Sequence, residues 1–148
     1  MSATTELGSE RILVVDDEAS VLSITCALLS RSGYAVLQAD CAERALEIFK
    51  DGKQPIDLLL TDVMMPKMQG PQLAELVVSL YPKTRVLFMS GFQDYRLEPK
   101  IAAGARLLPK PFSPEALLAA VRATLDERRK RDPGRETSGG GQRDASNG

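Results

Sequence analysis

Four short apolar runs, separated by longer segments with helical periodicity, constrain the fold of this chain more than any other feature of its sequence. The runs cover Ile12 to Val15, Leu58 to Leu60, Val86 to Met89 and Leu107 to Leu108, and a weaker fifth run covers Ala35 to Ala39. Runs that are apolar throughout are typical of strands buried on both faces of a parallel sheet. We therefore predict five strands that alternate with helices.

Glycine and proline residues mark the ends of the predicted helices. Gly33 can end the first helix in the left-handed conformation, and Gly52 closes the second. Asp40 with Glu43 resembles a capping box at the start of the second helix. Proline stands where a later helix begins in Gly70-Pro71 and again in Ser113-Pro114-Glu115.

Alternating strands and helices imply a parallel sheet with helices on both faces, because parallel neighbours need crossover connections. Counted in chain order with Ala35 to Ala39 as the second, the first, third and fourth strands are apolar throughout, so they belong at the centre of the sheet. Pro109 supports an edge position for the fifth strand, because proline cannot donate a ladder hydrogen bond. We predict a doubly wound α/β fold with strand order 2-1-3-4-5.

The length of 148 residues fits one compact domain. No apolar run is long enough to span a membrane, and the first residues lack the pattern of a signal peptide, so we expect a cytoplasmic location and no membrane partner. We expect residues 1–9 to be flexible and residues 10–127 to form the domain. Residues 128–148 are expected to form a disordered tail, first basic and then glycine-rich.

The sequence contains no histidine, which removes every mechanism that needs an imidazole base, ligand or phosphocarrier. Oxygen nucleophiles would therefore carry any phosphate chemistry. Cys26 and Cys41 lie in segments predicted as helical and lack the close spacing of a zinc or redox pair, so we expect buried reduced thiols.

Polar residues follow four of the predicted strands at the carboxyl end of each. Asp16-Asp17-Glu18 follows the first strand, Asp62 the third, Ser90 the fourth and Lys110-Pro111 the fifth. Each has a structural explanation when taken singly, such as a turn residue, a helix cap or a surface charge. Because the carboxyl ends of parallel strands meet at one rim of the sheet, their coincidence favours a functional site.

Carboxylates gathered at one place repel each other, and the usual resolution is a hard divalent cation with oxygen ligands. Magnesium is the natural candidate, with Asp17 as a direct ligand and Asp16 bound through water. Asp62, on the central third strand, is best placed to act as the nucleophile toward a phosphoryl group. Lys110 and the Ser90 hydroxyl would contact phosphoryl oxygens.

The motifs ILVVDDE, LLLTDVMMP, VLFMSG and LPKPF closely resemble the receiver domain of bacterial two-component response regulators, over about residues 10 to 127. The resemblance implies a flavodoxin-like (βα)5 fold and a phosphoacceptor switch with slow self-hydrolysis rather than an enzyme. It also implies that Asp62 is the phosphoacceptor and that Ser90 and Lys110 are the switch residues. Asp16, Asp17, Asp62 and the Met64 backbone carbonyl would hold Mg²⁺, and the Lys110-Pro111 bond would be cis.

The resemblance implies a histidine kinase or phosphotransfer protein as phosphodonor and a downstream protein as target, within a two-component system or a phosphorelay. The connection between Ser90 and Lys110 carries Pro99 and resembles that of receivers of hybrid histidine kinases. We expect no output domain and no direct DNA binding, because no aromatic residue interleaves the basic run. A homodimer through the face of the fourth helix and fifth strand is compatible with this resemblance.

Two other classes of function compete with this interpretation. A phosphatase of the haloacid-dehalogenase type also forms an aspartyl phosphate, but it needs a DxD motif after the first strand, where this chain has Asp16-Asp17-Glu18. A binding module that ignores phosphate would have lost acidic residues, and here every required position is filled.

Overall fold

The computed structural model describes residues 10–91 and 106–130, and these residues form five strands and four helices. The elements in chain order are β1 (Arg11–Val15), α2 (Ala19–Arg31), β2 (Ala35–Ala39), α3 (Ala42–Asp51), β3 (Leu58–Asp62), α4 (Gly70–Leu80), β4 (Arg85–Ser90), β5 (Arg106–Pro109) and α5 (Pro114–Lys130). All four strand pairs are parallel, and the sheet order is β2-β1-β3-β4-β5. The predicted strand order is confirmed.

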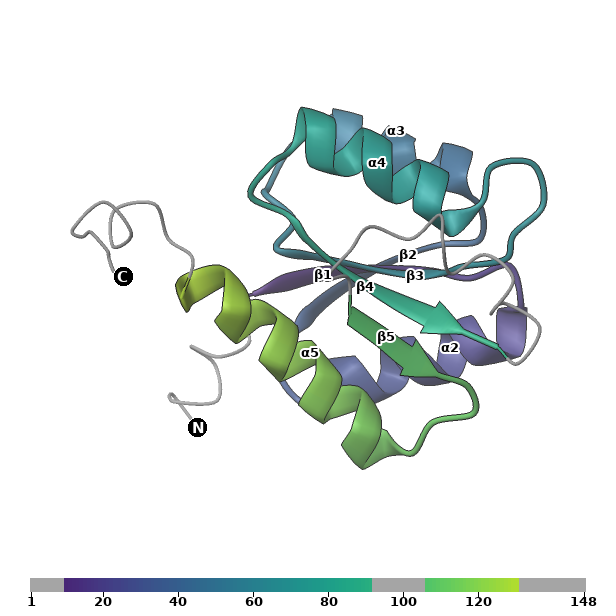
Figure 1. Ribbon diagram of the computed structural model, residues 1–148, viewed down its shortest axis with the longest axis vertical. Helices are drawn as coiled ribbons and strands as arrows, with labels where there is room; N and C mark the ends of the chain where they lie inside the picture. Colours follow the sequence, from purple (N-terminus) through teal and green to yellow (C-terminus); the bar gives the residue numbers. More distant parts are fainter. Residues whose placement is uncertain (1–9, 92–105, 131–148) are drawn as a thin grey trace, which may run out of the picture.

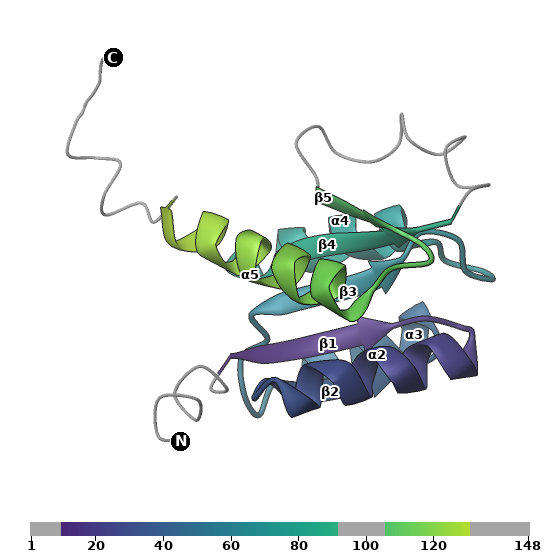
Figure 2. The same ribbon diagram turned by 90° about the horizontal axis from the view of Figure 1, so that it is seen from below.

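The sheet lies between two layers of helices, with α3 and α4 on one face and α2 and α5 on the other (Figures 1 and 2). Alternate residues of the central strands supply the two cores. Ile12 and Leu58 pack toward α2 and α5, whereas Leu13 and Leu59 pack toward α3 and α4. Every residue of β3 is buried, as expected of a central strand.

Two glycines end helices as predicted. Gly33 has φ 100° and donates its N–H to the Ser30 carbonyl, while the Tyr34 N–H reaches the Leu29 carbonyl, which is the double hydrogen bond of a Schellman motif. Gly52 follows α3 with φ 60°. Both conformations favour glycine because it has no Cβ.

Helix starts follow the sequence less closely. The capping box of Asp40 and Glu43 is wrong: Cys41 is the residue that precedes α3, and its side chain makes no cap hydrogen bond. At α4, the Gln69 N–H donates to the Gln72 side chain at 3.0 Å, a contact that the sequence analysis missed. Ser113 caps α5 as expected, because its Oγ accepts the Ala116 N–H at 3.0 Å.

Several predictions fall on residues outside the described ranges. They are the predicted flexibility of residues 1–9, the predicted fourth helix with Pro99, and the predicted disorder of the tail from residue 131 onward. The backbone of α5 continues to Lys130, beyond the predicted domain boundary at residue 127. None of the helices in the described parts of the chain combines the length and apolar character needed to cross a membrane.

Candidate functional site

The predicted site residues lie at one rim of the sheet, where β1, β3, β4 and β5 end. The register brings these ends level: Val15 pairs with Thr61, Asp62 pairs with Met89, and Ser90 pairs with Pro109. Asp16 follows β1 directly, and Lys110 follows β5. The parallel sheet therefore gathers residues that are far apart along the chain.

Three carboxylates form the acidic part of this rim. One carboxylate oxygen from each of Asp16, Asp17 and Asp62 lies within 4.8 Å of the other two. Asp16 is fully buried and Asp62 is 6% exposed, whereas Asp17 faces solvent. Close carboxylates of this kind repel one another unless a cation shares the site.

Lys110 brings a positive charge into contact with two of these carboxylates. Its Nζ lies 3.0 Å from Asp16 Oδ2 and 3.4 Å from Asp62 Oδ1. Burial alone would lower the pKa of Lys110, but Asp16 and Asp62 outweigh it and hold that pKa above its ordinary value. The ammonium group is therefore charged at neutral pH.

The backbone beside Lys110 is also fixed. The Lys110-Pro111 peptide bond is cis, as predicted. The Lys110 N–H donates to the Ser90 carbonyl at 2.8 Å, so β5 stays paired with β4 up to the rim. Ser90 itself is half-buried at the end of β4, next to the strand that carries Asp62.

Asp16 is held from two sides by backbone donors and acceptors. Its own N–H donates to the Ala39 carbonyl at 3.2 Å, which ties it to the end of β2. Its Oδ1 accepts the Glu18 N–H at 2.9 Å, in the local turn that aspartate favours before a helix. The other carboxylate oxygen, Oδ2, accepts from Lys110.

The peptide that follows Asp62 is held between a strand and a helix. The Val63 N–H donates to the Met89 carbonyl of β4 at 3.0 Å, and the Val63 carbonyl accepts the Gly70 N–H of α4 at 2.9 Å. The Thr61 hydroxyl donates to the Asp62 carbonyl at 3.0 Å. The sequence alone places neither Thr61 nor Gly70 at the site, because the Gly70-Pro71 pair predicts only that a helix begins there.

The cluster has the right chemistry for magnesium. Its donors are carboxylate oxygens, which are the ligands that hard divalent cations prefer. The three carboxylates and the one ammonium group give it a formal charge of −2. A divalent cation matches that charge. Met64, whose carbonyl the family resemblance assigns to the metal, lies in the loop after β3 and is 39% exposed.

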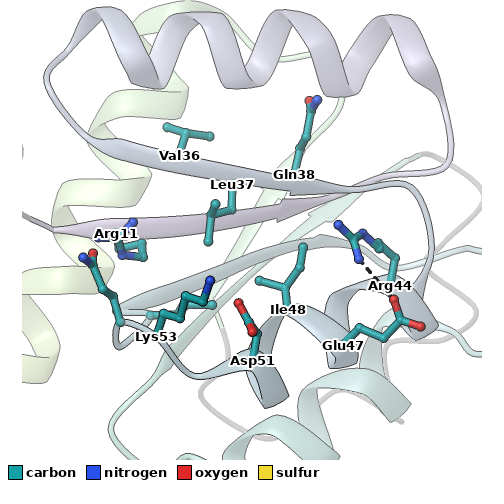
Figure 3. Close-up of a pocket in the computed structure, with 11 residues that line it drawn as sticks. Arg11, Val36, Leu37, Gln38, Arg44, Glu47, Ile48, Asp51 and Lys53 are labelled. Atoms are coloured by element: carbon teal, nitrogen blue, oxygen red, sulfur yellow. Dashed lines mark hydrogen bonds and ion pairs between the residues drawn. The ribbon is translucent and has the colours of Figure 1, made fainter.

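A separate cavity lies between β2 and α3 and contains none of these residues (Figure 3). It has a volume of about 860 Å³, and its lining mixes apolar side chains such as Leu37 and Ile48 with charged ones. Arg44 and Glu47 form an ion pair on its wall. Arg11, which also lines it, stands at the start of β1, whereas the acidic rim follows the end of that strand.

Comparison with known proteins gives consistent results. A family model described as "Response regulator receiver domain" matches residues 12–122. The Sensor kinase CckA of Brucella abortus (strain 2308) is 33% identical over 127 residues. The Response regulator receiver protein CpdR of the same organism is 31% identical over 118 residues. The crystal structure of a response regulator receiver domain protein from Clostridium thermocellum has a TM-score of 0.74 at 29% identity.

The matches differ in how much of each protein they cover. The sensor kinase match includes 84% of this chain but only 13% of the kinase. The CpdR match includes 78% of this chain and 97% of CpdR. The Clostridium thermocellum structure matches over 84% of this chain and 100% of its own. The chain therefore corresponds to a small part of one relative and to nearly the whole of another.

Proposed function

The chain belongs to the response regulator receiver domain family, and we propose that it accepts a phosphoryl group on Asp62. A phosphoacceptor role in two-component signalling follows from the family. The assignment to Asp62 rests on one observation above all. Lys110 Nζ lies 3.0 Å from Asp16 and 3.4 Å from Asp62, so groups from three strand ends meet at one point.

In the proposed reaction, a carboxylate oxygen of Asp62 attacks the phosphorus of a phosphohistidine on a histidine kinase or phosphotransfer protein. An O–P bond forms to Asp62 while the P–N bond breaks, and its electron pair stays on the imidazole. Lys110 donates to a phosphoryl oxygen, and its charge is already in place before the phosphoryl group arrives. The Ser90 hydroxyl donates to another phosphoryl oxygen.

Asp16, Asp17, Asp62 and the Met64 carbonyl are the groups that would hold Mg²⁺, with Asp16 acting through water. When bound, the ion supplies positive charge against the carboxylates and the phosphoryl oxygens. Asp16 also accepts a hydrogen bond from Lys110, so the buried Asp16 carboxylate has a second role in orienting the lysine. A buried carboxylate with a fixed orientation keeps the lysine directed at Asp62.

The output of the switch is a changed surface for a downstream protein. Phosphorylation favours a conformation in which Ser90, the last residue of β4, approaches the phosphoryl oxygens. The signal ends when water attacks the phosphorus and releases inorganic phosphate from Asp62. We expect this slow self-hydrolysis to be the sole catalytic step, and a cytoplasmic location remains a prediction of the sequence.

The competing functions are less well supported. A phosphatase of the haloacid-dehalogenase type would have its nucleophile after the first strand, whereas the residue on the central β3 here is Asp62. A module that ignores phosphate has no need of three carboxylates within 4.8 Å of one another. Gathering these charges costs stability, so the cluster favours the phosphoacceptor.

The test is incubation with acetyl phosphate and Mg²⁺, followed by the mass of the intact protein. The wild type should gain one phosphoryl group and Asp62→Asn should gain none. Asp51→Asn is a matched control, because Asp51 is an exposed aspartate at the end of α3. Equal labelling of Asp62→Asn and the wild type would refute the assignment, as would an unlabelled wild type.

A further inference from the structure

Gly70, the first residue of α4, lies against the backbone of Asp62. A Cβ atom at Gly70 would stand 2.2 Å from the Asp62 carbonyl oxygen and 3.1 Å from both the Asp62 carbonyl carbon and the Val63 Cα. All three are backbone atoms. A side-chain rotation therefore cannot make room for even one methyl group at this position.

Position 70 requires glycine because there is no room for a Cβ atom, and not because of the backbone conformation. The glycines with positive φ in the described residues are Gly33 and Gly52, where the left-handed region itself favours glycine. Gly70 is not among them, so alanine could adopt its backbone angles. What alanine cannot do is occupy the volume that the Asp62 carbonyl already fills.

The contact is reinforced by hydrogen bonding and packing on both sides. The Gly70 N–H donates to the Val63 carbonyl at 2.9 Å, and the Val63 N–H donates to the Met89 carbonyl at 3.0 Å. One turn into α4, Ala74 belongs to the same buried cluster as Val63 and Phe88. The first turns of α4 and the end of β4 therefore hold the peptide after Asp62 between them.

We propose that Gly70 is a positioning residue for the phosphoacceptor: its missing side chain lets α4 close onto the Asp62–Val63 peptide and fixes the direction of the Asp62 carboxylate and the Met64 carbonyl. The proposal rests on the function proposed above for Asp62. An added methyl group must displace either the helix or this peptide. The Val63 carbonyl accepts a hydrogen bond from the Gly70 N–H, so a shift of α4 also shifts the peptide after Asp62.

The test substitution is Gly70→Ala. We expect Mg²⁺ affinity, measured by calorimetry, to fall about tenfold, and the rate of labelling by acetyl phosphate to fall roughly 10- to 100-fold, as small misplacements of reacting groups do. The amide NMR signals of Asp62, Val63 and Met64 should shift before any Mg²⁺ is added. A purely structural role for Gly70 would lower stability without these changes.

Val77→Ala provides the matched control. Val77 is fully buried on the same helix, and its removal lowers the free energy of unfolding without placing an atom near Asp62. This variant should keep wild-type Mg²⁺ affinity and labelling rate at a temperature where it is folded. The proposal is overturned if Gly70→Ala binds Mg²⁺ like the wild type, or if Val77→Ala loses affinity equally.

A second variant covers the case in which Gly70→Ala does not fold. Ala74→Val adds bulk within the buried cluster that contains Val63, and should lower Mg²⁺ affinity by a smaller factor. Unchanged affinity in a folded Ala74→Val would then reject the positioning role. Failure of the phosphoacceptor assignment is distinguishable, because Asp62→Asn reports on labelling whereas Gly70→Ala is judged first on metal affinity.

Discussion

Lys110 illustrates how one side chain can be held at a site by competing effects. Burial opposes its positive charge, while hydrogen bonding and charge on Asp16 and Asp62 favour it, and the carboxylates prevail. The lysine is consequently both charged and oriented without a phosphoryl group. Such preorganisation lowers the cost of aligning donors during the reaction.

At Met64 the nature of the side chain should set the lifetime of the phosphorylated state. Met64 is 39% exposed, and its Sδ accepts a weak hydrogen bond from the Gln69 side chain at 3.8 Å. An apolar group beside the phosphoryl group hinders an attacking water, so we expect a long-lived acyl phosphate.

The corresponding prediction is that Met64→Asn speeds the loss of acyl phosphate by at least about twofold, because an amide can hold water near the phosphorus. Met64→Leu, which stays apolar, should keep the wild-type lifetime. Both can be timed by the decay of the phosphorylated mass after acetyl phosphate is removed. Equal decay of the two variants would contradict this role for Met64.

Cys26 predicts a loss of stability at alkaline pH. Both cysteines are free and half-buried, so the expectation of buried reduced thiols is only partly met. Burial raises the pKa of Cys26 to about 11. Between its ordinary pKa and this value, the unfolded chain releases the thiol proton while the folded chain keeps it. Raising the pH therefore favours unfolding.

The expected decline from this group is below about 1 kcal/mol per pH unit, because solvent screens a half-exposed thiol. Urea unfolding under reducing conditions between about pH 9 and pH 11 measures it. Cys26→Ala should lose part of the pH dependence of the wild type. A slope identical to that of the wild type would exclude this contribution.

At the scale of the elements, the loop between β3 and α4 carries a strained residue. Lys67 has φ 67°, the single positive value among non-glycine residues in the described ranges. A side chain in the left-handed region costs about 1–2 kcal/mol. Glycine at this position would remove that cost. It would also destabilise the fold by about 0.5–1 kcal/mol, because the unfolded chain gains conformational entropy.

We therefore predict that Lys67→Gly raises the free energy of unfolding by roughly 0.5 kcal/mol. Lys83→Gly is the matched control, because Lys83 is an exposed lysine in a turn and its φ is not positive. In Lys83→Gly the added conformational entropy of the unfolded chain acts alone, so the free energy of unfolding should fall. Urea denaturation of both variants measures the contrast, and the same sign in both would show that Lys67 is not strained.

Helix ends show which elements could be predicted from sequence. Gly33 and Gly52 were identifiable because a left-handed residue after a helix is a local requirement. The capping box of Asp40 and Glu43 failed because its hydrogen bonds need the helix to begin directly after Asp40, and the chain makes Cys41 the last residue before α3. Local patterns leave helix boundaries uncertain by a residue or two.

The same distinction applies to the site. Asp16, Asp62 and Lys110 could be predicted to meet, because the end of a parallel strand fixes where the next residue lies. Gly70 could not be recognised as part of this arrangement. Its importance depends on how closely a helix approaches the backbone of β3, and side-chain packing across the whole domain decides that distance.

At the scale of the whole molecule, Arg122 joins segments from both ends of the described chain. It donates two hydrogen bonds of 2.9 Å to Glu10 and one of 3.3 Å to the Tyr34 hydroxyl. These contacts tie α5 to the residues before β1 and β2. The hydrogen bonds to Glu10, partly offset by burial, hold the pKa of Arg122 above its ordinary value.

We predict that Arg122→Met lowers the free energy of unfolding by about 1–3 kcal/mol, because Glu10 loses a bidentate partner in a partly buried setting. Arg44→Met is the control, since the Arg44–Glu47 pair is exposed and should contribute less than about 0.5 kcal/mol. Urea denaturation gives both values. Losses of equal size would show that partial burial does not strengthen the Arg122 contacts.

The ion pair between Asp16 and Lys110 spans 94 positions of sequence. A ribosome therefore adds every carboxylate of the rim long before it adds the lysine that pairs with two of them. A nascent or truncated product ending before residue 110 would carry three crowded anions without this counter-charge. Such a fragment should resist closing its sheet, so synthesis must pass β5 before the rim can form.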